Sequence, residues 1–199
     1  MLAAVRVVAI TDRRLMGEGP RGFETAIARA LRGCAPGSVL VQVREKDLDG
    51  GSLLELVRIA GRYAPVSVND RVDVALAGNA AAVHLPERGM PVVAARALFN
   101  GVIGVSRHAP DAKTGADLVQ LGPIWPTPSK PDRPLGSAAL AASTDGRCIV
   151  AVGGIDGPAR AREAVAAGAD AVAVIRAAWT QDALAAMVAA VDEARVQRP

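Results

Sequence analysis

The segment QVREK, residues 42–46, carries charged side chains near the end of a short apolar run. If this run is a β-strand, Gln42, Arg44 and Lys46 point to one side of it, because successive side chains alternate between the two faces. Two cations on one face suit an anionic ligand. A solvated strand end is the alternative interpretation, because charged side chains are common at exposed positions.

Two neighbouring glycines, Gly153 and Gly154, follow the apolar run 149–152 and precede a helical pattern. Without side chains, they let an anion approach the backbone N–H groups closely, which favours a phosphate site. A second apolar run, in the segment AGADAVAVI, ends at Ile175 one unit later. The two runs together strengthen the phosphate interpretation, and a plain tight turn is the alternative.

The segment GPIWPTPSKPDRPLG, residues 122–136, is long for a strand-to-helix connection and rich in proline. Loops of this length inside a compact domain are more often binding loops than filler. Thr127, Ser129 and Lys130 stand at its centre. Their hydroxyl and ammonium groups predict a contact with a phosphate or diphosphate.

The chain has two histidines, and an imidazole with a reference pKa of about 6.5 is the usual group for moving a proton at neutral pH. His108 stands two residues after Ser106, past an expected strand end, and is the candidate acid–base group. His84 lies inside the apolar segment AAVHLP, so we expect it to be structural.

Eight short apolar runs alternate with Ala-rich helical patterns along the chain. We expect strands at residues 5–10, 39–43, 66–68, 82–85, 102–105, 118–121, 149–152 and 171–175. We expect helices at 23–32, 52–62, 71–77, 91–98, 137–142, 158–167 and 180–196. About 25 residues per unit predicts an α/β fold, a single (β/α)8 TIM barrel over residues 1–199. An open doubly wound sheet is the alternative.

Most polar and glycine-rich positions follow directly after the expected strands. In a parallel barrel the carboxyl ends of all strands converge on one face, so these groups would surround one mouth. The pattern therefore predicts one site for an anionic small molecule.

The composition limits the kinds of partner that can be expected for this chain of 199 residues. Its net charge of +3 comes from scattered residues and only 3% of its residues are aromatic, so we expect no nucleic acid partner. No apolar run reaches the ~18 residues of a membrane span, and the early charges argue against a secretory signal. We expect a cytoplasmic protein without a membrane partner.

Cys34 and Cys148 lack metal-ligand spacing, which argues against a zinc site or a disulfide framework.

Seven motifs follow the expected strands in this order: ITDR, QVREK, VNDRVDVAL, VHLPERG, GVSRH, GPIWPTPSK, and AVGGI together with GADAVAVI. In this order they resemble the thiamin phosphate synthase and TenI superfamily of (β/α)8 barrels, over nearly the whole chain. The resemblance implies that the following residues line a substrate pocket: Lys46, Asn69, Ser106, Thr127 and Lys130. It also implies that backbone at Gly154, Ile175 and Arg176 binds a phosphate, and that Arg44 either meets a carboxylate or is structural.

Two activities occur in that superfamily. Its synthases join a hydroxymethylpyrimidine diphosphate to a thiazole phosphate and hold Mg²⁺ between two aspartates, of which Asp70 matches the first. At the second position this chain has Gly89, and Glu87, which is close enough to substitute, is offset by two residues. Arg176 also stands where synthases usually have a serine. A hard cation needs oxygen ligands, so the glycine counts against the synthase.

The segment VHLPERG resembles instead the TenI branch, the thiazole tautomerases, which move one proton on a carboxythiazole phosphate without a metal. We therefore predict a thiazole tautomerase, an isomerase without a cofactor, with His108 as its catalytic group and a small phosphorylated thiazole as its ligand. A Mg²⁺-dependent synthase, a transferase with Asp70 as a metal ligand, is the first alternative. A noncatalytic regulatory protein that binds a phosphate ligand is the second. A homodimer is also compatible with the resemblance.

Overall fold

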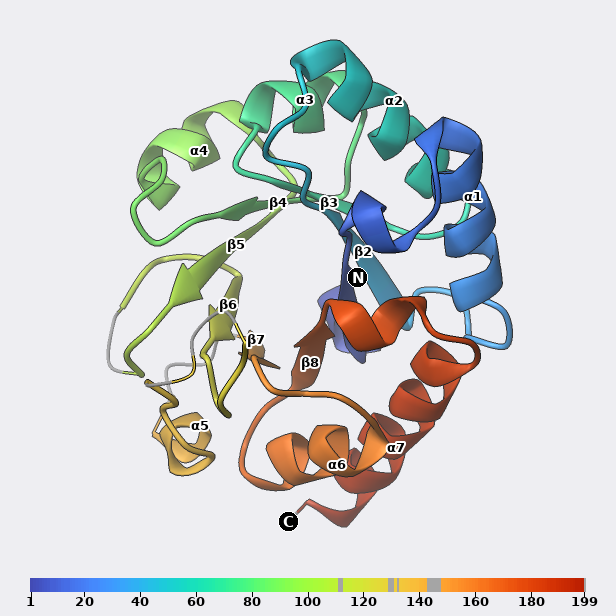
Figure 1. Ribbon diagram of the computed structural model, residues 1–199. Helices are drawn as coiled ribbons and strands as arrows, with labels where there is room; N and C mark the ends of the chain where they lie inside the picture. Colours follow the sequence, from blue (N-terminus) through green and yellow to red (C-terminus); the bar gives the residue numbers. More distant parts are fainter. Residues whose placement is uncertain (111–112, 129–130, 132, 143–147, 199) are drawn as a thin grey trace.

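Parallel strands close into a barrel in the computed structural model, which describes residues 1–110, 113–128, 131, 133–142 and 148–198. Each strand pairs with the next along the chain, and the last pairs with the first (Figure 1). The strands are β1 (Val7–Ile10), β2 (Val39–Val43), β3 (Val66–Asn69), β4 (Ala82–Leu85), β5 (Val102–Arg107), β6 (Leu118–Leu121), β7 (Cys148–Val152) and β8 (Ala171–Val174). This topology confirms the predicted (β/α)8 TIM barrel and excludes the open doubly wound sheet.

Helices surround the barrel on its outside (Figure 1). The α-helices are α1 (Gly19–Ala30), α2 (Gly50–Gly61), α3 (Val72–Ala77), α4 (Val92–Leu98), α5 (Ala138–Ala141), α6 (Pro158–Ala166) and α7 (Ala183–Gln197). Short 3-10 helices are η1 (Leu2–Ala4), η2 (Arg13–Leu15) and η3 (Arg176–Trp179). Within the described ranges, no helix has both the length and the apolar character needed to cross a membrane.

Several helix ends differ from the expected ranges for local reasons. Helix α1 begins at Gly19, before the expected residue 23, with Pro20 in its first turn, where a missing N–H costs nothing. Helix α2 begins at Gly50 because the Asp49 carboxylate accepts hydrogen bonds from the N–H groups of its first turn. The last helix begins at Ala183 and not at residue 180, because Asp182, directly before it, has a left-handed backbone with φ +57°, which a helix cannot include.

The barrel interior changes from apolar to polar along its axis. A cluster of buried apolar side chains fills one part of it: Val5, Val8, Ile10, Leu40, Leu118, Val150, Ala171 and Ala173. Toward the carboxyl ends of the strands the buried side chains are polar, among them Gln42, His84 and Gln120. The apolar part forms a rigid base of the barrel. At the other end, the buried polar groups need hydrogen-bond partners, and this end is suited to a binding site.

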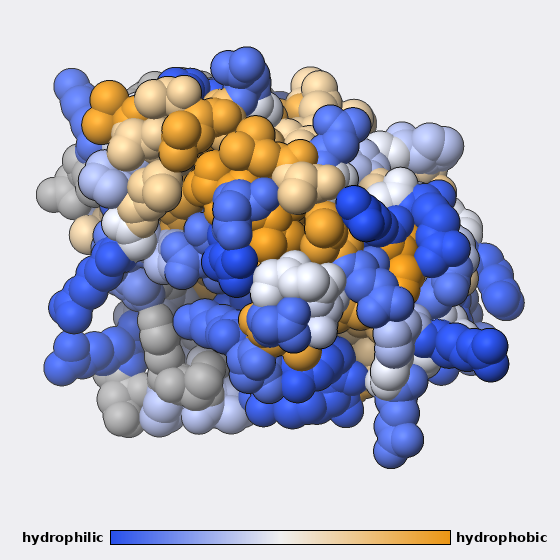
Figure 2. All heavy atoms as spheres, turned by 90° about the horizontal axis from the view of Figure 1, so that it is seen from above, coloured by the Kyte–Doolittle hydropathy of each residue, from blue (hydrophilic) through white to orange (hydrophobic). Residues whose placement is uncertain are grey.

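Apolar side chains gather on the outer face formed by α2, α3 and α4, with charged side chains around them (Figure 2). Leu76 of α3 is 51% exposed, and Val93 and Leu98 of α4 are 80% and 58% exposed. Exposed apolar patches of this kind often mark contact surfaces. The homodimer with which the resemblance is compatible stays untested.

Candidate active site at the carboxyl end of the barrel

Three buried amide side chains form a polar layer across the barrel. Gln120 Nε2 on β6 donates a hydrogen bond of 2.5 Å to Gln42 Oε1 on β2. Gln42 Nε2 in turn lies 3.4 Å from Asn69 Oδ1 on β3. Because each amide has its orientation set by the next, this layer forms a rigid floor for whatever binds above it.

His84 extends this layer on β4. Its ring is fully buried, and Nε2 lies 2.8 Å from the Ser106 hydroxyl oxygen on β5. Burial, with a smaller effect from the positive charge of Arg44, lowers the pKa of His84 to about 3, so the ring is neutral at physiological pH. His84 therefore has a structural position, as expected, but it also lines the cavity and orients the hydroxyl of Ser106.

A cavity of about 940 Å³ opens above this floor, at the carboxyl ends of the strands. The expected site residues that line it are Arg44, Lys46, Asn69, Ser106, His108, Thr127, Gly153, Gly154, Ile175 and Arg176. The barrel thus brings the imidazole of His108 and the glycine pair to one cavity. Ser129 and Lys130 lie outside the described residues.

The glycine pair after β7 has a backbone that other residues rarely adopt. Gly153 has φ +95° and Gly154 has φ +72°. A Cβ atom on Gly154 would lie 2.5 Å from Cβ of Trp125, so the position excludes a side chain by space as well as by conformation. Trp125 N–H donates to the Gly153 carbonyl at 3.1 Å, which attaches the loop after β6 to the glycine pair.

The same turn leaves backbone donors for a ligand. Within the described part of the chain, the N–H groups of Gly154 and Arg176 have no hydrogen-bond acceptor. Both residues line the cavity, directly after β7 and β8. Such unpaired amides are suited to the oxygens of a phosphate.

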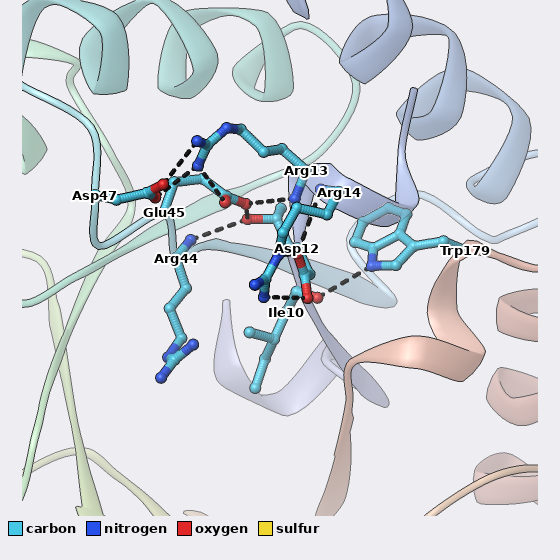
Figure 3. Close-up of polar contacts among 9 residues, drawn as sticks. Ile10, Asp12, Arg13, Arg14, Arg44, Glu45, Asp47 and Trp179 are labelled. Carbon is cyan, nitrogen blue, oxygen red and sulfur yellow. Dashed lines mark hydrogen bonds and ion pairs between the residues drawn. The ribbon is translucent and has the colours of Figure 1, made fainter. Parts of the chain in front are cut away.

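The arginines near β1 and β2 differ in whether their charge is already paired (Figure 3). Arg13 binds Asp47 at 2.6 Å and Glu45 at 3.4 Å, and Arg14 binds Asp12 at 2.7 Å. Arg44 points away from these ion pairs, lines the cavity, and has no ion-pair partner among the described residues. Its charge, with that of Lys46, is therefore free to attract an anionic ligand.

Glu45 is a buried residue at the cavity whose positioning role the alternation pattern alone does not identify. Its buried carboxylate accepts hydrogen bonds from the Thr11 hydroxyl at 2.6 Å and from the Arg13 N–H at 3.0 Å. The Thr11 hydroxyl oxygen also accepts a hydrogen bond from the Arg44 N–H at 3.0 Å. Glu45 thereby joins the ends of β1 and β2 and holds the backbone of Arg44. The only sequence signal is a carboxylate beside a buried strand end, which requires partners.

Glu87 and His108 form a second pair that the sequence does not reveal. Glu87 Oε2 lies 2.6 Å from His108 Nδ1, and its Oε1 accepts a bond of 3.3 Å from the His108 N–H. Burial alone would raise the pKa of Glu87, but the hydrogen bonds from the ring and the backbone N–H of His108 lower it overall. Both oxygens of Glu87 are therefore engaged by His108.

The residues after β3 and β4 do not fit a resident magnesium site. Asp70 has an exposed carboxylate and is absent from the cavity lining. Gly89 beside it supplies no ligand, and Glu87 is held by His108. Among the described residues, no three His, Cys, Asp or Glu side chains come together as a cation would require.

A model of a known family, Thiamine monophosphate synthase, matches residues 7–178. The chain belongs to the thiamine monophosphate synthase family. The thiamine-phosphate synthase of Roseiflexus sp. (strain RS-1) is 40% identical over 191 residues, which cover 86% of this chain and 77% of that protein. The thiamine-phosphate synthase of Chloroflexus aurantiacus is 38% identical over 194 residues, covering 89% and 86%. Among solved structures, thiamine phosphate pyrophosphorylase from Pyrococcus furiosus has a TM-score of 0.81 and 30% identity, covering 97% and 98%.

These relatives overturn the prediction of a thiazole tautomerase of the TenI branch. The relatives from Roseiflexus and Chloroflexus are named as synthases, which are transferases and not isomerases. The error came from the weight given to Gly89, a single position in the loop after β4. A glycine at this position means that one carboxylate is missing, but the cationic side chains after β2 and the glycine turn after β7 remain. The acid–base role expected of His108 belonged to the tautomerase and is withdrawn with it.

Proposed function

We propose that this member of the family is a thiamine-phosphate synthase, a transferase that joins hydroxymethylpyrimidine diphosphate to a thiazole phosphate. The names of its relatives support this reaction. The observation that carries the proposal is a single cavity with two separate regions for anions. One region is the backbone turn at Gly153 and Gly154, and the other is formed by Arg44 and Lys46. Two anionic substrates need two such regions.

In this proposal the thiazole phosphate binds the unpaired backbone amides after β7 and β8. Gly153, Gly154 and Ile175 supply backbone without a competing charge, and Arg176 adds a cationic side chain at the same rim. Anions are stabilised there by aligned N–H groups, which need no reorganisation when the ligand arrives.

The diphosphate of the second substrate lies toward Arg44 and Lys46. Asn69 and Ser106, whose side chains are held by Gln42 and His84, provide hydrogen bonds for a polar ring at the cavity floor. Thr127 lines the opening and is a further hydroxyl donor. The rigid floor fixes the ring so that its reactive carbon faces the thiazole nitrogen.

The reaction breaks the bond between the pyrimidine methylene carbon and the diphosphate oxygen, and forms a bond between that carbon and the thiazole nitrogen. Negative charge grows on the departing diphosphate, so cations placed there stabilise the transition state more than the ground state. Arg44 and Lys46 are the side chains of this chain that we assign to that task.

A two-substrate assay tests the proposal. Purified protein is incubated with both substrates and Mg²⁺, and thiamin phosphate and diphosphate are measured as equimolar products. We expect turnover at roughly one per second. Arg44→Met should lower this rate at least tenfold, whereas Arg58→Met, on the exposed face of α2, should leave it unchanged. Binding of the thiazole phosphate without any product would contradict the proposed function.

A further inference from the structure

Arg107, the last residue of β5, has a guanidinium group that the protein uses only in part. The residue is half-buried and lines the cavity. Its Nη1 donates a hydrogen bond of 3.1 Å to the Ser106 carbonyl oxygen. Its Nε is the one buried side-chain nitrogen or oxygen that has no hydrogen-bond partner in the described part of the chain. Because a buried donor without an acceptor is costly, this nitrogen indicates an acceptor that a ligand supplies.

The unused part of this guanidinium is the edge that binds carboxylates elsewhere in the chain. Arg14 uses Nε and Nη2 to bind the two oxygens of Asp12, at 2.7 and 2.8 Å. Arg71 uses the same two nitrogens to bind Asp73, at 2.8 and 2.6 Å. In Arg107 both nitrogens lack a partner among the residues that the structure describes. The edge has two parallel N–H groups, which match two oxygens of one carboxylate or phosphate.

The carboxylate next to this arginine is already engaged. Glu87 binds His108, the residue after Arg107, through both of its oxygens. Across the described ranges, Arg107 forms no ion pair with a carboxylate of the protein. Its charge therefore remains available to an anionic ligand of the cavity, as does that of Arg44.

Arg107 and Arg44 are both close to the pair formed by His84 and Ser106. Arg107 follows Ser106 and is bonded to its carbonyl oxygen. Burial lowers the pKa of His84 and the positive charge of Arg44 lowers it further, so this cation lies near the ring. The ring in turn lies 2.8 Å from the Ser106 hydroxyl oxygen. The two arginines therefore face the same part of the cavity, where the proposed reaction has its diphosphate.

The departing diphosphate needs more positive charge than the residues after β2 provide. It carries several negative charges, whereas Arg44 and Lys46 supply one positive charge each. A third cation with two parallel donors stabilises the charge that grows on a phosphoryl group, and its geometry is fixed before the reaction.

We propose that Arg107 is a further binding residue for the diphosphate, and that its Nε and Nη2 donate hydrogen bonds to two oxygens of one phosphoryl group. The inference rests on the proposed function in one respect, because diphosphate is taken to be a ligand of this cavity. It adds a contact from β5 to the contacts of Arg44 and Lys46.

Calorimetric titration with inorganic diphosphate tests this contact, in the same Mg²⁺ buffer as the turnover assay. Arg107→Met removes the charge and the donors but keeps most of the apolar stem. The variant should bind diphosphate at least tenfold more weakly than the unchanged protein, because a paired contact to a charged group is lost.

Arg14→Met is the matched control. Arg14 also lines the cavity, but Asp12 already occupies its Nε and Nη2 edge. The control variant removes the same charge from the same cavity, so it measures the long-range effect of charge alone. We expect it to weaken diphosphate binding less than threefold. A loss in Arg107→Met no larger than the loss in Arg14→Met would overturn the proposal.

Arg107→Lys tests whether the paired donors matter beyond the charge. Lysine keeps the positive charge but replaces the planar edge by a single ammonium group. This variant should bind diphosphate more tightly than Arg107→Met and at least threefold more weakly than the unchanged protein. Full affinity in Arg107→Lys would overturn the two-oxygen contact.

Binding of the thiazole phosphate separates a direct contact from a structural role. Its phosphate is assigned to the backbone amides after β7 and β8, so the variants of Arg107 should bind it as the unchanged protein does. If Arg107→Met lost affinity for both ligands equally, its effect would be structural and the proposal would be overturned. If Arg107→Met does not fold, Arg107→Lys decides by the same comparison of the two ligands.

These titrations separate this inference from the proposed function. Absence of turnover, together with the expected selective loss of diphosphate binding, would reject the synthase and keep Arg107 as a binding residue for diphosphate. Normal turnover, together with equal losses in Arg107→Met and Arg14→Met, would keep the synthase and reject this inference.

Discussion

The Thr11 hydroxyl donates a hydrogen bond of 2.6 Å to Oε1 of Glu45, and its oxygen accepts one of 3.0 Å from the backbone N–H of Arg44. One small side chain thereby links the end of β1 to two successive residues after β2. The link holds the backbone of Arg44 while its side chain reaches into the cavity. The position of the Arg44 guanidinium thus depends on the buried carboxylate of Glu45, which does not itself bind the ligand in our proposal.

Glu45→Ala should destabilise the protein by about 1–3 kcal/mol, because the Thr11 hydroxyl and the Arg13 N–H lose their buried acceptor. Glu45→Gln keeps one acceptor oxygen and should lose clearly less stability and less affinity for diphosphate. Urea denaturation and calorimetric binding measure the two quantities. Asp47→Asn, which changes the exposed partner of Arg13, is the matched control and should have a smaller effect than Glu45→Ala. Equal losses in all three variants would contradict the role given to Glu45.

Gly154→Ala should weaken binding of the thiazole phosphate at least tenfold and destabilise the fold by about 1 kcal/mol or more. Alanine is strained at the positive φ of this position, and its methyl group would also clash with the Cβ atom of Trp125. Gly157→Ala, three residues later, is the control, because nothing lies within 4 Å of a Cβ atom there. Calorimetric titration of both variants checks the prediction, and similar binding by the two would contradict it.

The barrel and the place of its site could be predicted because each depends on local pattern and on topology. Apolar runs of four or five residues separated by helical patterns leave few alternatives to a parallel barrel. Once the barrel is assumed, residues as distant as His108 and Gly154 must meet at one end. Strand ends were less predictable, and β5 continues to Arg107, two residues past its expected end.

The partners of the charged side chains could not be predicted in this way. Glu45 and Thr11 are 34 residues apart and Glu87 and His108 are 21 apart, so their contacts depend on how two loops approach each other. The activity was mispredicted for a related reason. The glycine at position 89 shows that a carboxylate side chain is missing, but it does not show which reaction the other residues of the cavity can still catalyse.

The buried ring of His84 should make stability fall as the pH is lowered. Its pKa of about 3 in the folded protein is below the ordinary 6.5, so the unfolded chain binds a proton that the folded protein does not. The free energy of unfolding should therefore fall by up to about 1.4 kcal/mol per pH unit from this group as the pH falls below 6.5.

Urea denaturation at pH 7.5, 6.5, 5.5 and 4.5 measures this effect, with His84→Gln as the comparison. The variant is expected to be less stable at pH 7.5, because the bond to Ser106 changes, but its stability should fall less steeply with acid. Carboxylates contribute equally to both proteins, so the difference in slope isolates the histidine. Parallel curves would show that the ring of His84 is accessible to protons in the folded state.

The Glu87–His108 pair should contribute little to stability although its distance is short. Their side chains are 37% and 42% exposed, and ion pairs at such positions contribute about 1 kcal/mol or less. The pKa of Glu87 is lowered in the folded protein, so its contribution is present above the ordinary carboxyl pKa and is lost as the pH falls through the lowered value. Glu87→Gln should therefore be slightly less stable than the unchanged protein at pH 7, and the difference should shrink toward pH 3.5 in urea denaturation. Glu55→Gln, on the exposed face of α2, is the control and should show no such pH-dependent difference. If the loss of stability in Glu87→Gln grew as the pH was lowered, the role given to the Glu87–His108 pair would be refuted.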